Sequence, residues 1–210
     1  MRRLAALALV FLAGCGSSGG ETPVELGTDA RLGPVQLVER LREGGLVVYL
    51  RHAATDRSKD DAGVIDLDDC STQRNLNDEG REQARTIGAA FRALEIPVGT
   101  VLSSEYCRTR ETAKLAFGRA TDEPALTGFP NEGDPGYDER VAATRGLLGA
   151  PAGDDNTVLV AHVKNLEAAA DVSIEEGELA VFEPHGEGSF TYRGHIPASA
   201  WPQLVEELGP

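Results

Sequence analysis

Helical and strand-like patterns of apolar residues alternate along most of the chain. Short apolar runs at residues 46–50, 99–102 and 157–161 predict buried strands, and residues 179–182 and 189–193 alternate like antiparallel or edge strands. Helices are predicted at residues 34–42, 78–94, 106–117, 138–148, 164–170 and 201–208. This order predicts an α/β fold in which three layers (α/β/α) contain a mostly parallel central sheet.

The pattern of the first residues indicates a targeting segment. Met1-Arg2-Arg3 is followed by ten consecutive apolar residues, 4–13, which are too few to span about 30 Å of hydrocarbon. The run ends in Leu12-Ala13-Gly14-Cys15, which resembles the bacterial lipobox, where the chain is cut before a cysteine that then carries lipid. We therefore expect a signal peptide (1–14), a lipidated Cys15 with a flexible Gly/Ser-rich tether (15–32) and one domain (33–210). The alternative is an ordinary signal peptide in which Cys15 is incidental.

Composition and charge narrow the class of protein. The 210 residues are 41% hydrophobic, enough for one core, and 34 acidic against 20 basic residues give a formal net charge of −14. Loss of residues 1–14 removes two arginines and no acid, so the processed chain carries −16. This balance excludes a basic nucleic-acid-binding protein, because neutralising phosphate backbones needs clustered Lys and Arg. The expected location is the periplasm or the cell exterior, on a membrane held through the lipid.

The two remaining cysteines, Cys70 and Cys107, form an even pair in a protein expected to be exported. An oxidising compartment makes them candidates for a disulfide, the alternative being two reduced thiols in a packed core. Neither has a His or another Cys at ligand spacing, so we expect no metal site.

Candidate chemistry lies where the predicted strands end. Arg51 and His52 follow the first strand, and His162 follows the strand at 157–161. Ser103 and Ser104 end the second strand, with Arg108 close behind. Ligands bind beyond the carboxyl ends of strands in parallel sheets, so these side chains are expected to converge.

Four separated motifs between about residues 46 and 182 resemble the histidine phosphatase (phosphoglycerate mutase-like) superfamily. VYLRHAATD is similar to its Arg-His-Gly signature, and QRNLNDEGREQA to the segment that follows it. VLSSEYCRTRETA is similar to the Ser-Ser helix, and LVAHVKN carries the second histidine of the pocket. The four motifs occur in the order that the family has.

The resemblance implies roles for particular residues. His52 would be the nucleophile that forms a phosphohistidine, because a neutral imidazole nitrogen attacks without first losing a proton. Arg51 and Arg108 would bind the phosphoryl oxygens with their planar, permanently charged groups. His162 would stabilise the charge that grows on those oxygens.

Two neutral side chains are candidate substrate-binding groups. Thr55 and Asn165 could add hydrogen bonds to the phosphoryl group, although each is equally well explained as a turn or helix-start residue. The expected partner is a small phosphorylated substrate, and the chemistry requires no cofactor.

The chain departs from the family pattern at three points. Ala53 replaces the glycine after the nucleophile, and Val163 stands where many members have glycine. No motif assigns the general acid. Glu132 and Asp134 are the better candidates and Asp56 a further one, the alternative being that all are solvated loop carboxylates. The six aspartates of residues 56–69 are likewise expected in a surface loop.

The sequence therefore predicts an extracytoplasmic, lipid-anchored phosphatase that hydrolyses phosphomonoesters. The alternative is a catalytically weak or inactive lipoprotein that binds phosphate or phosphoesters on the same scaffold. Ala53 and the unassigned general acid are the reasons for keeping this alternative.

Overall fold

The computed structural model describes residues 31–128 and 131–210. The predicted signal peptide (1–14), Cys15 and all but the last two residues of the tether (15–32) lie outside the described residues. Within the part described, no helix has the length and apolar character needed to cross a membrane.

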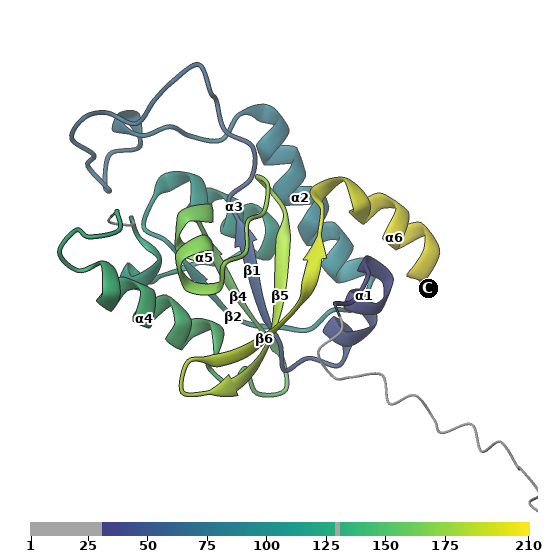
Figure 1. Ribbon diagram of the computed structural model, residues 1–210. Coiled ribbons are helices and arrows are strands. Elements are labelled where there is room, and N and C mark those ends of the chain that lie inside the picture. The colour runs from purple at the N-terminus through teal and green to yellow at the C-terminus, as the bar shows by residue number, and fades with distance from the viewer. Residues whose placement is uncertain (1–30, 129–130) are drawn as a thin grey trace, which may run out of the picture.

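Six strands form one sheet in the order β3-β2-β4-β1-β5-β6 (Figure 1). Their bounds are β1 Val47–Arg51, β2 Val98–Ser103, β3 Thr121–Asp122, β4 Asn156–Ala161, β5 Leu179–Gly186 and β6 Ser189–Ile196. Pairing is parallel from β3 through β1 and antiparallel for β1 with β5 and β5 with β6. The mostly parallel sheet with antiparallel strands at one side confirms the predicted fold class.

Helices cover both faces of the sheet and complete the three layers (Figure 1). Their bounds are α1 Pro34–Arg42, α2 Asp78–Ala93, α3 Cys107–Phe117, α4 Tyr137–Leu148, α5 Val163–Ala170 and α6 Trp201–Leu208. One core cluster joins the sheet to α1, α2, α3 and α6, and a second joins it to α4 and α5. Strand β1 serves both: Val48 and Leu50 enter the first cluster and Val47 and Tyr49 the second, because successive side chains point to opposite faces.

Strands β5 and β6 are longer than their apolar patterns predict. The pattern indicated 179–182 and 189–193, whereas the strands continue to Gly186 and Ile196. They form a hairpin whose turn consists of Glu187 and Gly188, both with positive φ. Pairing between the two strands extends them beyond the buried residues.

A long connection between β1 and α2, residues 52–77, passes over the carboxyl end of the sheet (Figure 1). Its base is closed by a bridge between Thr55 and Leu76. The 3₁₀ helix η1, Cys70–Thr72, joins it to α3 through a disulfide between Cys70 and Cys107, with an S–S distance of 2.00 Å. The pairing that the sequence allowed is present, and it ties the connection to the helix that carries Arg108.

Helix α2 begins where the side chain of Asn77 accepts a hydrogen bond from Gly80 N at 2.7 Å. A Cβ atom at Gly80 would lie 2.0 Å from the carbonyl oxygen of Ala54. Glycine therefore lets the helix pack directly against the chain two residues after His52.

Candidate active site

The predicted strand-end residues meet at one edge of the sheet. Arg51 is the last residue of β1 and His52 follows it, while His162 follows β4 directly. Arg108 lies in the first turn of α3, shortly after β2. Because β2, β4 and β1 are parallel neighbours, their carboxyl ends bring these four residues together around one pocket.

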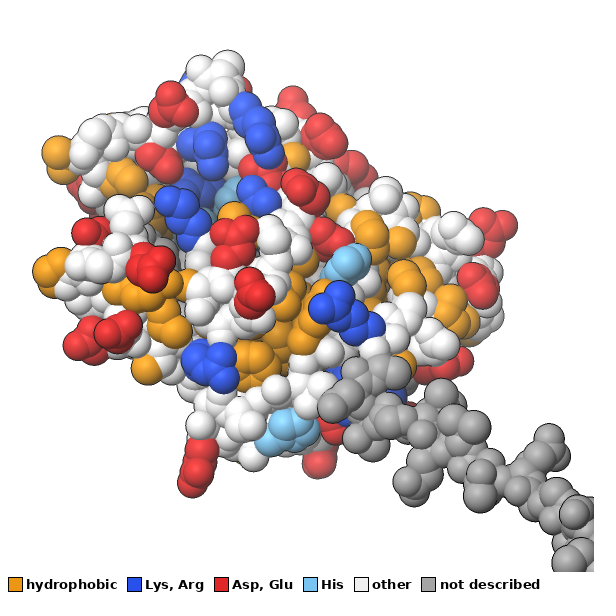
Figure 2. All heavy atoms as spheres, in the orientation of Figure 1, with side chains coloured by type: hydrophobic (Ala, Val, Ile, Leu, Met, Phe, Trp, Pro, Cys, Tyr) orange, Lys and Arg blue, Asp and Glu red, His pale blue; other side chains and the backbone are white. Residues whose placement is uncertain are grey.

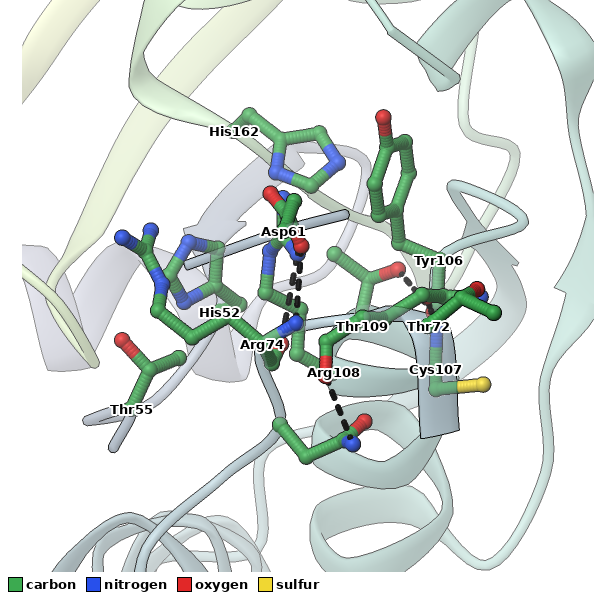
Figure 3. A network of polar contacts seen from close by, with 12 residues as sticks. His52, Thr55, Asp61, Thr72, Arg74, Tyr106, Cys107, Arg108, Thr109 and His162 are labelled. Atoms are coloured by element: carbon green, nitrogen blue, oxygen red, sulfur yellow. Dashed lines mark hydrogen bonds and ion pairs between the residues drawn. The ribbon is translucent and has the colours of Figure 1, made fainter. Parts of the chain in front are cut away.

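The pocket has a volume of about 330 Å³. Besides the four strand-end residues it is lined by Asn165, which is fully buried. Six further residues contribute to its wall: Asp61, Arg74, Tyr106, Gly128, Val163 and Lys164. Figure 3 shows the central part, where Asp61 and Arg74 from the β1–α2 connection meet Arg108 and the two histidines. The volume suits a phosphoryl group and part of its ester.

His52 is held as a neutral imidazole. Its side chain is buried, and its Nδ1 lies 3.0 Å from the carbonyl oxygen of Ala53. Because a carbonyl only accepts, Nδ1 carries the proton and the lone pair is on Nε2. Burial lowers the pKa of His52 to about 4, and the neighbouring Arg108 and Arg51 act in the same direction. At neutral pH the ring has an uncharged, nucleophilic nitrogen.

His162 is likewise neutral. Burial, followed by the charge of Arg108, lowers its pKa well below the usual range. Its Nε2 lies 3.0 Å from Ser104 Oγ, and its backbone carbonyl accepts a hydrogen bond of 2.8 Å from Tyr49 Oη. The ring of Tyr106 packs edge-on at 4.9 Å between centroids. These contacts fix the ring at the pocket wall.

Three arginines share an unusual feature. Arg51, Arg74 and Arg108 each have a buried Nε with no hydrogen-bond partner within the described chain. These Nε atoms are inaccessible from the pocket, whereas the three side chains themselves line it, so their guanidinium charges favour an anion there.

One terminal nitrogen, Nη1, of each of Arg51 and Arg108 holds the side chain in place. Arg51 Nη1 donates to the carbonyl oxygen of Ile174 at 2.8 Å. Arg108 Nη1 donates to Asp61 Oδ1 at 2.9 Å, and its guanidinium carbon lies 4.3 Å from the centre of the Tyr106 ring. Both side chains therefore reach the pocket in a defined orientation.

The β1–α2 connection supplies residues to which the sequence assigned no role in the site. Arg74 lies within a matching motif, whereas nothing in the local sequence distinguishes Asp61 from the other aspartates of residues 56–69. The expectation that this whole stretch is a solvated surface loop is wrong for Asp61, which lies in the pocket wall. Long-range contacts with Arg108 and with the backbone N of Arg74 draw it inward.

Gln73 couples this connection to α3 beside the disulfide. Its Oε1 accepts a hydrogen bond of 2.8 Å from Cys107 N, and its Nε2 donates to Asp66 O at 2.9 Å. Arg74, the next residue, is thereby held near the first turn of α3.

Thr55 does not line the pocket. Its hydroxyl donates to Glu176 Oε1 at 2.9 Å, and Glu176 also pairs with Arg57 at 3.4 Å. The structure therefore does not support direct substrate binding by Thr55, because its hydroxyl faces a neighbouring hollow that Glu176 lines. The negative charge of Glu176 partly opposes the lowering of the His52 pKa.

None of the three carboxylates expected as general acids lines the pocket. Glu132 and Asp134 are exposed in the segment before α4, where Asp134 accepts hydrogen bonds from Asn131. Asp56 accepts from Ser58 and pairs with Lys59 at 3.8 Å. The structure places these groups as loop carboxylates, since Asp56 and Asp134 have local partners and none of the three side chains lines the pocket.

Ala53 and Val163, which stand where the family pattern has glycine, fit their positions in the structure. Ala53 is fully buried and does not have a positive φ, so its methyl group introduces no backbone strain. Its N–H donates to Thr112 Oγ1 at 3.1 Å. Val163 is the first residue of α5 and contributes to the pocket wall, which it narrows by its side chain.

Residues 31–128 and 131–210 contain no cluster of three or more His, Cys, Asp or Glu side chains suited to holding a metal ion. The pocket accordingly presents cationic and neutral groups to a ligand, with one carboxylate among them.

Comparison with known proteins gives a family match for part of the chain. Residues 47–128 match the model of the histidine phosphatase superfamily, branch 1. This segment includes His52 and Arg108 and ends before His162. Sequence comparison with curated proteins found no match.

Solved structures share the fold at low sequence identity. An Escherichia coli K-12 protein, solved as a candidate α-ribazole-5′-phosphate phosphatase, is 16% identical with a TM-score of 0.54, over 71% of this chain and 96% of that one. The protein histidine phosphatase SixA, solved with tungstate, is 16% identical with a TM-score of 0.51, over 73% and 97%. A phosphoserine phosphatase variant from Entamoeba histolytica, solved with phosphoserine, is 13% identical with a TM-score of 0.51, over 73% and 97%.

Proposed function

With the resemblance to the histidine phosphatase superfamily and the phosphoglycerate mutase-like fold confirmed, we propose that this protein hydrolyses phosphomonoesters through a phosphohistidine on His52. The observation that carries the proposal is the presence of a neutral, buried His52 and three arginines in the lining of one pocket. A phosphoryl group supplies both an electrophile for the imidazole and an anion for the guanidinium groups.

The reaction follows from the protonation state of His52. The lone pair of Nε2 attacks phosphorus, the bond from phosphorus to the ester oxygen breaks, and the electron pair leaves with that oxygen. Arg51 and Arg108 hold the equatorial oxygens, where negative charge is concentrated in the transition state. Water then attacks the phosphohistidine, and the electron pair of the P–N bond returns to Nε2.

The charge of the pocket is opposite to that of the whole chain. Arg51, Arg74, Arg108 and Lys164 line it together with a single carboxylate, Asp61. Figure 2 shows Lys and Arg side chains gathered around a hollow that contains a histidine, with acidic side chains spread over the rest of this face. Charges beyond about 8 Å are largely screened at physiological salt, so the nearby cations decide whether an anion binds.

Hydrolysis of p-nitrophenyl phosphate by the domain from residue 31 onward tests the proposal. His52→Gln should lower kcat/KM by at least about 10³-fold, because the nucleophile is lost. His185→Gln is the matched control, since His185 is exposed on β5 and its ring contacts Thr191. Activity that survives in His52→Gln would exclude the phosphohistidine mechanism.

Phosphate binding without turnover is the second candidate function. It is favoured by the position of Glu132 and Asp134 outside the pocket, which leaves the expected general acids unused. Rapid quenching with a labelled phosphodonor separates the two: an enzyme yields an acid-labile phosphohistidine on His52, and a binding protein yields none.

Lipid anchoring of the exported protein at Cys15 is part of the same proposal. It is supported by the apolar run at 4–13, by the small residues before Cys15 and by a disulfide typical of an oxidising compartment. Labelling of cells with a radioactive fatty acid should mark the full-length chain and not Cys15→Ala. Equal labelling of both would refute anchoring at this residue.

A further inference from the structure

Asp61 is the carboxylate that the fold brings into the pocket. Its Oδ1 accepts a hydrogen bond of 2.9 Å from Arg108 Nη1 and one of 2.8 Å from Arg74 N. Its side chain is 27% exposed, so it is accessible from the pocket mouth. Figure 3 shows it between the His162 ring and the arginine side chains. It therefore lies beside a group expected to hold phosphoryl oxygen.

The other proton-carrying groups of the described pocket are less suited to donate to a leaving group. Burial raises the pKa of Tyr106, which makes its hydroxyl a weaker acid. Burial lowers the pKa of His162, so that its ring is not an imidazolium at neutral pH. Lys164 is exposed at the first turn of α5. The remaining candidate proton donor in the described pocket is the carboxyl group of Asp61, which contacts Arg108.

Glu176 lies close enough to His52 for its charge to affect the pKa of that ring, but its oxygens are engaged elsewhere. Its two oxygens accept from the hydroxyl and the backbone N of Thr55, and it pairs with Arg57. It lines the neighbouring hollow and not the pocket. Asp61 is thus the carboxylate of the described chain that is placed to exchange a proton with a bound ester.

We propose that Asp61 is the general acid and base of the reaction. The inference rests on the phosphatase activity proposed above. As the bond from phosphorus to the ester oxygen breaks, the Asp61 carboxyl gives its proton to that oxygen, and a neutral alcohol leaves. In the second step the Asp61 carboxylate takes a proton from the water that attacks the phosphohistidine, which returns the carboxyl group to its starting state.

The ion pair between Asp61 and Arg108 is the contact that a bound phosphoryl group replaces. In the substrate-free pocket, the carboxylate of Asp61 accepts a hydrogen bond from Nη1 of the buried Arg108. When phosphoryl oxygens take over that guanidinium, they place like charge beside Asp61. A phosphate monoester that binds as its monoanion passes its one proton to the adjacent carboxylate, so the proton that Asp61 later gives to the leaving oxygen comes from the substrate.

The surroundings hold Asp61 in position. The N–H of Arg74 fixes its Oδ1, and Arg74 follows Gln73, which is bound to Cys107 N. The disulfide joins the same two segments. The carboxylate therefore has a fixed position relative to Arg108, as a proton-transfer group needs.

The test compares kcat/KM for substituted phenyl phosphates, whose leaving groups are acidic, with kcat/KM for ethyl phosphate. Asp61→Asn should lower kcat/KM by less than about tenfold for p-nitrophenyl phosphate and by about 10²-fold or more for ethyl phosphate. Asp61→Glu, which keeps a carboxyl group, should recover part of the ethyl phosphate activity. Asp60→Asn is the matched control, because it makes the same charge change at an exposed neighbour.

Two outcomes would overturn the assignment while leaving the proposed function intact. A loss in Asp61→Asn that is equal for all leaving groups would make Asp61 a positioning residue. A gain with every substrate would make it a competitor for Arg108. The proposed function itself fails only if the wild-type domain hydrolyses none of these esters or if His52→Gln is as active as the wild type.

Discussion

The imidazole rings of His52 and His162 lie edge to face, with their centroids 5.5 Å apart. His52 is buried and His162 is half-buried beside Arg108, and desolvation is the main reason that both pKa values are lowered. Two imidazolium ions at this separation would repel each other and the guanidinium groups. The pocket is therefore built for neutral imidazoles, and an incoming anion is held by arginine.

The stability of the folded domain should fall as the pH falls from about 6.5 to 4. In the unfolded chain His52 has its ordinary pKa of about 6.5, whereas in the folded chain burial lowers this pKa to about 4. Between these values the unfolded state binds more protons, so the free energy of unfolding decreases by roughly 3 kcal/mol from this residue. Urea unfolding of the wild type and His52→Gln across this range should show a smaller decrease in the variant. Parallel curves would contradict the buried, neutral state of His52.

Arg108→Lys should lower kcat/KM for p-nitrophenyl phosphate by about 10²-fold, because an ammonium group cannot reproduce the planar contacts of a guanidinium. Arg110→Lys on the same helix is the control. Arg110 donates twice to Asp122, at 2.7 Å each, and does not line the pocket. Activity should be little changed in this second variant; equal losses would indicate a general effect on α3.

Replacing both cysteines, Cys70→Ser with Cys107→Ser, should destabilise the domain and lower its activity. The bond closes a loop with a sequence separation of 37, for which chain entropy gives about 4 kcal/mol of stabilisation. Activity should fall because the same connection carries Asp61 and Arg74. Thermal unfolding with and without a reductant checks both effects, and the double variant should not respond to the reductant. If reduction of the disulfide changed neither the activity nor the melting temperature of the wild type, the disulfide would have no such stabilising role.

Gly80→Ala should destabilise the domain by about 1–3 kcal/mol and reduce phosphatase activity, because the new methyl group meets Ala54 O at 2.0 Å. The backbone that would have to move lies two residues from His52. Gly146→Ala in α4 is the control, since nothing lies within 4 Å of its Cβ position. Alanine there should stabilise the domain by roughly 0.5–1 kcal/mol. Urea unfolding of both variants, together with kcat/KM, distinguishes close packing from a general effect of alanine.

The sequence predicted the six helices and five of the six described strands; it missed β3, Thr121–Asp122, and ended β5 and β6 too early. Helix α1 has the predicted bounds, and α2 ends one residue earlier than its apolar pattern. These elements depend on local signals, such as the Asn77 cap and the buried stripe of Ala84, Ile87 and Phe91. The carboxyl ends of the central strands could be predicted in the same way. The convergence of Arg51, His52 and His162 therefore followed from the parallel arrangement of these strands.

What the sequence by itself determined is therefore the α/β fold, the family resemblance and the set of residues that follow the strands. The tertiary structure decided the rest of the pocket. Asp61 and Arg108 are 47 residues apart, and their contact depends on how the β1–α2 connection folds across the sheet. Likewise Glu176, 121 residues from Thr55, accepts the hydrogen bond of the Thr55 hydroxyl, which the sequence predicted to bind a substrate. Periodicity and motifs describe neighbours along the chain, whereas these contacts arise between surfaces that meet only after folding.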